Sequence, residues 1–182
     1  MGVTHVLPWG EPLTYDDLQA MPDDGHRYEL VDGVLIVTPA PRRLHQRAIT
    51  RLLVLLHGAA PPDVEVLPAP LDYVVSDVTV LEPDIIAAYA ADYGDYNLQQ
   101  TPLLVVEVLS PSTARIDRGT KRLAFEGAGV PSYWLVDPDE PSLTVLELEG
   151  ETYREAAHVT GDEAYTTSRP FDVTVVPADL VR

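Results

Sequence analysis

Residues 103–109 read Leu-Leu-Val-Val-Glu-Val-Leu, and this stretch decides the fold. Such a run, apolar at every position but one, is typical of a central strand that is covered on both faces. Residues 115–128 follow with an apolar stripe at helical spacing, and Gly129 lies just beyond the predicted end of that helix. Residues 132–136 then return as a strand. The sequence therefore predicts a βαβ unit whose two strands are parallel.

Two hairpins are predicted, one on each side of this unit. The first turns at Asp32-Gly33, a dipeptide of the type that gives the strongest short signal for a hairpin. The second turns at Glu149-Gly150 and closes the fold. The four strands of these hairpins span residues 27–31, 34–38, 143–148 and 153–159.

A second principal helix is predicted at residues 42–57, where apolar side chains recur at intervals of three and four. Gly58 and Pro61 end it. Thr14 could cap a short helix nearer the start of the chain. That helix and four further strands are expected at residues 14–20, 64–67, 70–75, 78–81 and 84–88. Together these elements predict an α/β fold, with a sheet of mixed direction and two principal helices.

The composition of the 182 residues narrows the class of protein. This length suits a single domain over residues 1–182, with residues 1–25 as an extension that carries the short helix. The absence of cysteine excludes a disulfide framework, a thiolate metal site and a cysteine nucleophile. The first eighteen residues do not resemble a secretion signal, and no apolar run approaches the roughly 20 residues of a membrane helix. A soluble, cytoplasmic protein without a membrane partner is expected.

The formal net charge of −17, from 29 acidic and 12 basic residues, argues by itself against a nucleic-acid partner. Eight of the 12 basic residues nevertheless fall in two short segments. They are Arg42, Arg43, Arg47 and Arg51 in the first segment, and Arg115, Arg118, Lys121 and Arg122 in the second. These segments are either two solvated helix faces or a local positive strip on an acidic body.

Three acids stand in apolar surroundings. Glu107 is the polar residue of the central strand, where a buried carboxylate costs several kcal/mol unless it is paired or bound to a cation. Asp84 begins another strand, and Glu29 lies in the first hairpin, where the turn geometry places it opposite Ile36. Acids that project from strand ends into one cleft suit a hard cation such as Mg²⁺ or Mn²⁺. Alternatively, Asp84 is a solvated or capping residue at the start of its strand, and Glu29 pairs with an arginine such as Arg27.

Lys121 is the one lysine of the chain. Because the other basic residues are arginine, this position could require the compact charge of an ammonium. Lys121 lies two turns into the helix after Glu107, so it could reach back over the end of that strand. The alternative is an ordinary i,i+4 pair with Asp117. His45, in the arginine-rich helix, is either incidental or part of the same site.

Several other kinds of site are excluded by their missing motifs. The histidines show no metal-binding spacing, and Ser110 and Ser112 lack the Gly-x-Ser-x-Gly elbow of a serine hydrolase. The chain contains neither a Gly-x-Gly-x-x-Gly sequence nor a Walker loop, which removes the usual nucleotide-binding folds.

Taken in order, the motifs resemble the Uma-type restriction endonuclease family within the PD-(D/E)XK nuclease superfamily, from about Tyr15 to the C-terminus. The residues that carry the resemblance are Tyr28-Glu29-Leu30-Val31-Asp32-Gly33, His45, Pro83-Asp84, Val105-Val106-Glu107-Val108-Leu109-Ser110-Pro111-Ser112, Asp117, Lys121, Gly129-Val130-Pro131 and Tyr133-Trp134-Leu135-Val136-Asp137-Pro138.

This resemblance implies a restriction-endonuclease-like mixed β-sheet flanked by helices, and it implies roles for individual residues. Asp84 and Glu107, with the carbonyl of Val108, would hold one or two Mg²⁺ or Mn²⁺ ions. The superfamily usually places a lysine two residues after the second acid, but that position is Leu109 here. The resemblance implies a lysine displaced onto the following helix, which Lys121 matches. It also implies that Glu29 is an extra acid near the site and that His45 is a polar residue at its edge.

The activity that follows is metal-dependent hydrolysis of DNA phosphodiester bonds by an endonuclease. The arginine-rich helix could contact the phosphate backbone. Two alternatives stay open: a non-catalytic binding or assembly module on a nuclease scaffold, and a metal-dependent hydrolase or phosphatase acting on something smaller than DNA. The apolar strands near Tyr133-Trp134 suggest a homodimer, unless these aromatic side chains fill the core.

Overall fold

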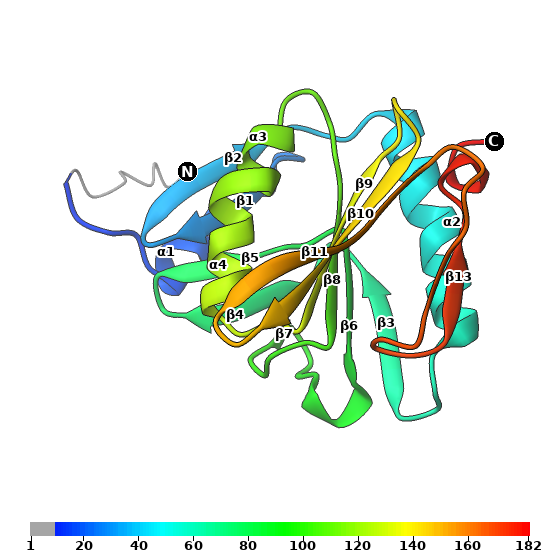
Figure 1. Cartoon of the computed structure of the whole chain (residues 1–182). Helices are drawn as coiled ribbons and strands as arrows, with labels where there is room; N and C mark the ends of the chain where they lie inside the picture. The colour runs from blue at the N-terminus through cyan, green and yellow to red at the C-terminus, as the bar shows by residue number, and fades with distance from the viewer. Residues whose placement is uncertain (1–9) are drawn as a thin grey trace.

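A six-stranded sheet forms the centre of the computed structural model, which describes residues 10–182 (Figure 1). Its strands in chain order are β3 (Val64–Pro68), β6 (Ile85–Tyr89), β8 (Leu104–Val108), β9 (Ser132–Asp137), β10 (Ser142–Glu149) and β11 (Thr152–Thr160). Across the sheet the order is β11-β10-β9-β8-β6-β3. β8 and β9 are parallel and the other neighbours are antiparallel, so the predicted mixed sheet and the parallel βαβ unit are confirmed.

The crossover from β8 to β9 departs from a regular helix. It begins as α3 (Ala114–Ile116), widens into the π turn η2 (Asp117–Lys121) and continues as α4 (Arg122–Gly127). The prediction of one regular helix over residues 115–128 was therefore wrong at its centre. Apolar spacing does not report a π turn, because the stripe continues on either side of it. Such turns are rare and occur frequently at functional sites.

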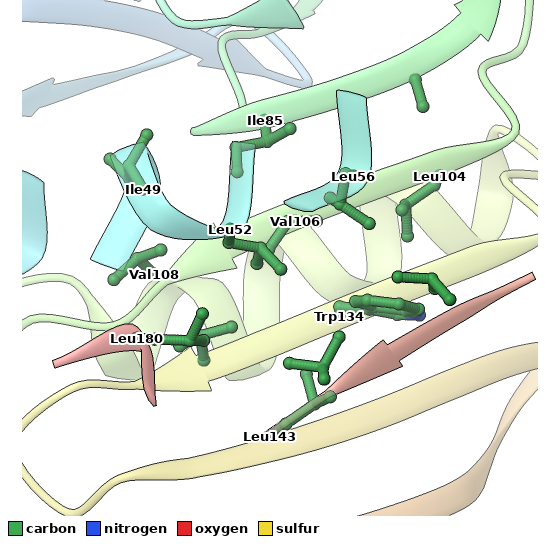
Figure 2. Packing of buried hydrophobic residues seen from close by; sticks show 14 of the residues in the cluster. Ile49, Leu52, Leu56, Ile85, Leu104, Val106, Val108, Trp134, Leu143 and Leu180 are labelled. Atoms are coloured by element: carbon green, nitrogen blue, oxygen red, sulfur yellow. The ribbon is translucent and has the colours of Figure 1, made fainter. Parts of the chain in front are cut away.

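Both faces of β8 are covered, as its sequence predicts. Val106 and its alternate neighbours pack against α2 (Arg43–Ala59), the second predicted helix, whereas Val105 faces Phe125 of α4. In Figure 1 the central sheet lies between α4 and α2. Figure 2 shows Leu52 and Leu56 of α2 over Val106.

The two aromatic residues of β9 fill the core. Tyr133 and Trp134 are fully buried within the chain, on opposite faces of the central sheet. They therefore form no surface on which a second copy could dock. The homodimer expected from this strand stays a prediction without their support.

A second sheet carries the first hairpin and has the order β2-β1-β5-β4-β7. Its strands are β1 (Arg27–Val31), β2 (Val34–Thr38), β4 (Asp72–Ser76), β5 (Thr79–Leu81) and β7 (Asn97–Leu98). β1 and β2 join through Asp32 and Gly33, with φ of 50° and 75°, as a type I′ turn requires. This register places Glu29 opposite Ile36, as predicted. Gly33 also packs against Pro12, whose Cβ would lie 2.3 Å from any added Cβ.

The remaining elements include five that the sequence did not predict as regular structure, three strands and two 3₁₀ turns. Thr14 caps the short helix α1 (Tyr15–Gln19) through a reciprocal capping box with Asp17, as expected for a helix in this segment. The unpredicted strands are β7, β12 (Tyr165–Thr167) and β13 (Val173–Val175), and the 3₁₀ turns are η1 (Ala90–Asp92) and η3 (Pro177–Leu180). Within residues 10–182, none of the helices has the length and apolar character needed to cross a bilayer.

The closing hairpin is longer than predicted and turns one residue later. Glu149 pairs with Thr152, so the two turn residues are Gly150 and Glu151. Gly150 has φ of 66°, a conformation that glycine adopts readily. The prediction placed Glu149 in the turn because glycine often takes the second position there, but in this hairpin it takes the first.

Candidate active site

The predicted acids Asp84 and Glu107 lie at the same end of the central sheet, Asp84 immediately before β6 and Glu107 within the neighbouring β8. Ile85 of β6 pairs with Val106 of antiparallel β8, and this register places Asp84 level with Glu107. Oδ2 of Asp84 accepts a 2.8 Å hydrogen bond from the backbone N–H of Val108. Both carboxylates are about 2% exposed. Two acids that are far apart in the chain are therefore brought to one place by the strand register.

Lys121 projects from the π turn into the same region and is also buried. Its Nζ lies 2.8 Å from Oε1 of Glu29 and 2.9 Å from Oε1 of Glu107. The alternative i,i+4 pair with Asp117 is present at 3.9 Å, the longest of the three contacts. One ammonium therefore serves three carboxylates, and its pair with Glu107 joins the crossover helix to β8.

Glu29 contributes a fully buried carboxylate from β1. Its Oε1 accepts a 2.8 Å hydrogen bond from the backbone N–H of Glu82 in addition to its contact with Lys121. Its Oε2 has no hydrogen-bond partner among the described residues. The alternative of a pair between Glu29 and Arg27 is not found, because that guanidinium is bound elsewhere.

Arg27 is a component of the site that the sequence did not single out. Its Nε lies 2.8 Å from Oε1 of Glu82, and its NH1 lies 3.0 Å from Oδ1 of Asp84. A signal was available, because side chains two apart on a strand share a face and Glu29 follows Arg27 by two. Glu82 was missed as well, although it lies two residues before Asp84.

His45 lies at the start of α2 and is directed at Asp84. Its Nε2 is 3.2 Å from Oδ2 of Asp84, and its Nδ1 is buried without a hydrogen-bond partner among the described residues. Burial alone would raise the pKa of Asp84. The hydrogen bond from His45 and the charge of Arg27 outweigh burial and lower this pKa to about 2. Asp84 is thus held ionised.

Three acids of the site, Glu107, Glu82 and Asp117, have a pKa above the ordinary value. Burial raises the pKa of Glu107 well above its ordinary range, although the Lys121 ammonium opposes this shift. Burial likewise raises the pKa of Glu82 to about 7 and that of Asp117 to about 6. Repulsion between neighbouring carboxylates adds to the effect of burial, since among the described residues of the site five acids share two permanent cations, Arg27 and Lys121.

Lys121 keeps its proton. Burial by itself would lower the pKa of the ammonium, but the carboxylates of Glu107, Glu29 and Asp117 raise it above the ordinary value for lysine. Tyr133 secures the turn that carries this residue, because its hydroxyl donates a 2.9 Å hydrogen bond to the carbonyl of Asp117. Lys121 is therefore a fixed positive charge rather than a proton acceptor.

These groups line a cleft of about 560 Å³. Its polar lining includes Arg27, His45, Glu82, Asp84, Glu107, Asp117 and Lys121, all from the site described above. Other parts of the wall come from residues 38–42, the Ala69-Pro70 dipeptide and residues 110–113, together with Asp23, Gly25, His26 and Gln46. The volume lies in the range of about 300–1,000 Å³ that small-molecule sites occupy.

Whether these residues fit a divalent cation can be judged from their donors. Over residues 10–182, no group of three or more His, Asp or Glu side chains is arranged to hold an ion. Mg²⁺, however, is usually held by one or two carboxylates and several waters. Asp84 and Glu107 supply hard oxygen donors in a cleft with excess negative charge. Beside them, Oε2 of Glu29 has no hydrogen-bond partner within residues 10–182. The donor set therefore fits such an ion.

The two arginine-rich segments do not form a continuous positive strip. Arg47 and Arg51 of α2 donate hydrogen bonds to the backbone carbonyls of Val181 and Asp179, so they hold the C-terminal segment. Three further arginines pair with acids: Arg42 with Asp139, Arg118 with Asp137, and Arg122 with Glu126. Lys121 is buried in the site. Most of this positive charge is therefore already engaged within the chain.

Comparisons with known proteins agree with this architecture. A sequence model of the Uma2 family, described as "Putative restriction endonuclease", matches residues 15–177. A crystal structure of a putative nuclease belonging to DUF820, from Anabaena variabilis, has a TM-score of 0.77 and 19% sequence identity over 93% of this chain and 98% of that chain. This likeness confirms the predicted restriction-endonuclease-like fold. No curated protein sequence matches the chain.

Proposed function

The chain belongs to the Uma2 restriction endonuclease family, and from this membership and the geometry of the cleft we propose that it hydrolyses DNA phosphodiester bonds in a metal-dependent reaction. The observation that carries the proposal is the meeting of Asp84, Glu107 and Lys121 in one cleft. Both acids are costly to bury in their ionised form, and each lies beside a cation, Asp84 beside Arg27 and Glu107 beside Lys121.

Asp84, Glu107 and the backbone carbonyl of Val108 would hold Mg²⁺ or Mn²⁺. The N–H of Val108 faces Asp84, and the N–H and C=O of one strand residue point to the same side, so the carbonyl is expected on that side too. When bound, such an ion lowers the pKa of a water molecule and offsets charge on the phosphate. The raised pKa of Glu107 indicates that this acid would lose its proton as the ion binds.

Lys121 supplies a second positive charge that is already in place. Because its ammonium stays protonated, it would stabilise the negative charge that develops on the phosphate oxygens as water attacks. It would also hold Glu107 and Glu29 in fixed orientations. His45 and Arg27 both contact Asp84 and would orient this carboxylate.

Titration calorimetry with Mg²⁺ and Mn²⁺ tests the metal site. The wild-type protein is expected to bind at least one of these ions, and an Asp84→Asn, Glu107→Gln double variant is expected to bind it at least about tenfold more weakly. Glu65→Gln, at an exposed acid on β3, is the matched control and should bind as the wild type does. Equal affinity of the double variant would contradict the assignment of these acids.

Cleavage of end-labelled DNA, offered both as single strand and as duplex, tests the activity. Glu107→Gln should lower the rate by at least about 100-fold, because it weakens the binding of the ion that would stabilise transition-state charge. Glu65→Gln should leave the rate unchanged. If neither form of DNA is cut in Mg²⁺ or Mn²⁺, the chain is better described as a binding or assembly module on a nuclease scaffold.

A further inference from the structure

The groups that would act on phosphate lie at the base of the cleft, not on its rim. Asp84 and Glu107 are each 2% exposed and Lys121 is 4% exposed, although all three line the cleft. A phosphate group can approach them only by entering it. In a duplex, each phosphate is flanked by its neighbours and by the opposite strand. Enzymes whose active site is a deep pocket therefore act on a single strand or flip the target nucleotide out of the base stack.

Three segments of the cleft wall carry no charged side chain and are partly apolar, whereas Asp23, His26 and Arg42 line it elsewhere. The three segments include Pro39, Ala40 and Pro41 on one, Pro70 on a second, and Ser110, Pro111, Ser112 and Thr113 on a third. Proline rings offer flat apolar surface to a sugar or a base, and hydroxyl groups can donate to phosphate oxygens. A cleft of about 560 Å³ has the size of a site for a small molecule, on the order of one or two nucleotides.

The rim offers few positive charges to a long polyanion. Arg42 lines the cleft but is paired with Asp139 at 2.6 Å. Arg43 and Arg115 adjoin the cleft segments and have no ion pair among the described residues. A protein that makes about 6–10 phosphate contacts with duplex DNA binds with a steep dependence on salt. These three arginines fall well short of that number, and the net charge of the chain is −17.

We propose, resting on the proposed nuclease function, that the substrate of this cleft is an unpaired single strand of DNA and that intact duplex is excluded. The strand enters between the proline-bearing walls and presents one phosphate to the buried groups. At most about three phosphates are contacted by arginine at the rim, so binding depends weakly on salt.

The first test measures binding without cleavage. Glu107→Gln is titrated against a labelled single strand of about twelve nucleotides and against a duplex of the same sequence, at salt concentrations from about 50 to 200 mM. The single strand is expected to bind more tightly, and log K should fall with log salt at a slope of about −2 or shallower, since each single-strand phosphate contributes about −0.7. Tighter binding of the duplex, or a slope of about −5 or steeper, would overturn the proposal.

The second test blocks the cleft. Ala40→Trp places a large side chain on an exposed wall residue and should abolish detectable binding of the single strand. Ala91→Trp makes the same exposed substitution in η1, outside the cleft lining, and should bind as the unblocked protein does. Circular dichroism checks that both variants fold. Equal binding by the two folded variants would place the strand elsewhere and overturn the proposal.

Cleavage by the wild-type protein separates this proposal from the nuclease function on which it rests. Cutting of the single strand at least about tenfold faster than the duplex supports both. Equal cutting of the two forms would overturn the preference and leave the nuclease function standing. Tight binding of the single strand with no cutting in either metal would overturn the nuclease function and leave the binding preference.

Discussion

Oδ2 of Asp84 accepts a hydrogen bond of 2.8 Å from the backbone N–H of Val108. Ile85 is the first residue of β6, so the carboxylate of Asp84 continues the hydrogen bonding between β6 and β8 beyond the last strand pair. This bond attaches one predicted metal ligand to the strand that carries the other. The separation of Asp84 and Glu107 is therefore set by the rigid centre of the sheet, and not by a loop.

Replacement of Lys121 by methionine should be strongly destabilising at neutral and higher pH. The substitution keeps the length of the side chain but leaves Glu29 and Glu107 buried without their shared cation. Breaking a buried ion pair in this way costs about 3–5 kcal/mol of unfolding free energy. Urea unfolding at about pH 8 measures the change, and nuclease activity should be lost even where the variant remains folded.

Arg118→Met is the matched control for that substitution. Arg118 lies in the same π turn, but its side chain is more than half exposed and its pair with Asp137 is 3.5 Å long. Exposed pairs contribute about 0–1 kcal/mol. A Lys121→Met variant as stable as Arg118→Met would show that the buried carboxylates do not depend on the ammonium.

Tyr133→Phe should lower activity by loosening the π turn that carries Lys121. The substitution removes the hydroxyl that donates to the carbonyl of Asp117, while the ring keeps its packing against Phe125. We expect a loss of about 1 kcal/mol in stability and a clear decrease in kcat, because Lys121 is held less firmly. The affinity for Mg²⁺ should change little, since Tyr133 contacts neither proposed acidic ligand.

Tyr153→Phe provides the comparison. Tyr153 is buried in the same aromatic cluster and its hydroxyl also donates to a backbone carbonyl, that of Val130, at 2.8 Å. The Tyr153→Phe variant should lose a similar amount of unfolding free energy as Tyr133→Phe but keep the kcat of the wild-type protein. If both variants lose kcat equally, the effect arises from the core and not from the π turn.

In the absence of divalent cations, the protein should be more stable at about pH 5 than at about pH 8. Burial raises the folded-state pKa of Glu82 to about 7 and that of Asp117 to about 6. A carboxyl whose pKa is higher in the folded than in the unfolded state stabilises the fold at low pH, and this contribution is lost as pH rises through the folded pKa. Each pKa unit corresponds to about 1.4 kcal/mol, so the total loss should reach a few kcal/mol.

Asp84 changes the pH dependence of stability in the opposite direction, and it does so at lower pH. Its folded pKa of about 2 lies below the ordinary value, so its stabilising contribution is lost as pH falls from about 4 toward 2. Thermal unfolding across this range should therefore show a maximum on the acidic side of neutrality. A maximum at about pH 8 would contradict the excess of buried negative charge.

Added Mg²⁺ should reverse the loss of stability at high pH. Ionised Glu107 is the form that would bind the cation, so Tm should rise more with Mg²⁺ at about pH 8 than at about pH 5. Thermal unfolding with and without Mg²⁺ at the two values measures this difference. In the Asp84→Asn, Glu107→Gln variant the difference should vanish. An equal rise in Tm at both values in the wild-type protein would contradict the prediction.

Gly33→Ala should destabilise the hairpin that carries Glu29. The residue has φ of 75°, and an added Cβ would lie 2.3 Å from Cβ of Pro12. The expected loss is at least about 2 kcal/mol, from backbone strain and overpacking together. Gly58→Ala, in α2 with no atom within 4 Å of the added Cβ, should instead stabilise slightly. Urea unfolding of the two variants measures both changes in unfolding free energy.

The elements that were predicted correctly are those whose local sequence pattern alone indicates one structure. The apolar run of β8, the type I′ turn at Asp32-Gly33 and the spacing of α2 each indicate one structure locally, and all three are found. β12 and β13 were not predicted because their three-residue strands are too short for a pattern to repeat. Their position depends on packing against α2, which local sequence does not encode.

The candidate site was partly predictable for the same reason. Glu107 was conspicuous because its strand is otherwise apolar, and the rarity of lysine drew attention to Lys121. Arg27 was not singled out, because a partly exposed arginine in a hairpin is common and only the register across two sheets brings it to Asp84. Which arginines face the cleft likewise depends on tertiary contacts: Arg47 and Arg51 bind backbone carbonyls of the C-terminal segment, and Arg42 pairs with Asp139.

The wide turn at residues 117–121 limits how this protein could be engineered for heat resistance. Each α-helical residue rotates by about 100° around the axis, so deleting one residue to regularise the crossover would swing every later or earlier side chain away from its present direction. The ammonium would then leave its three carboxylates, which lie on other elements or earlier in the same turn. Straightening this helix would improve its hydrogen bonding but would remove the ammonium from the proposed active site.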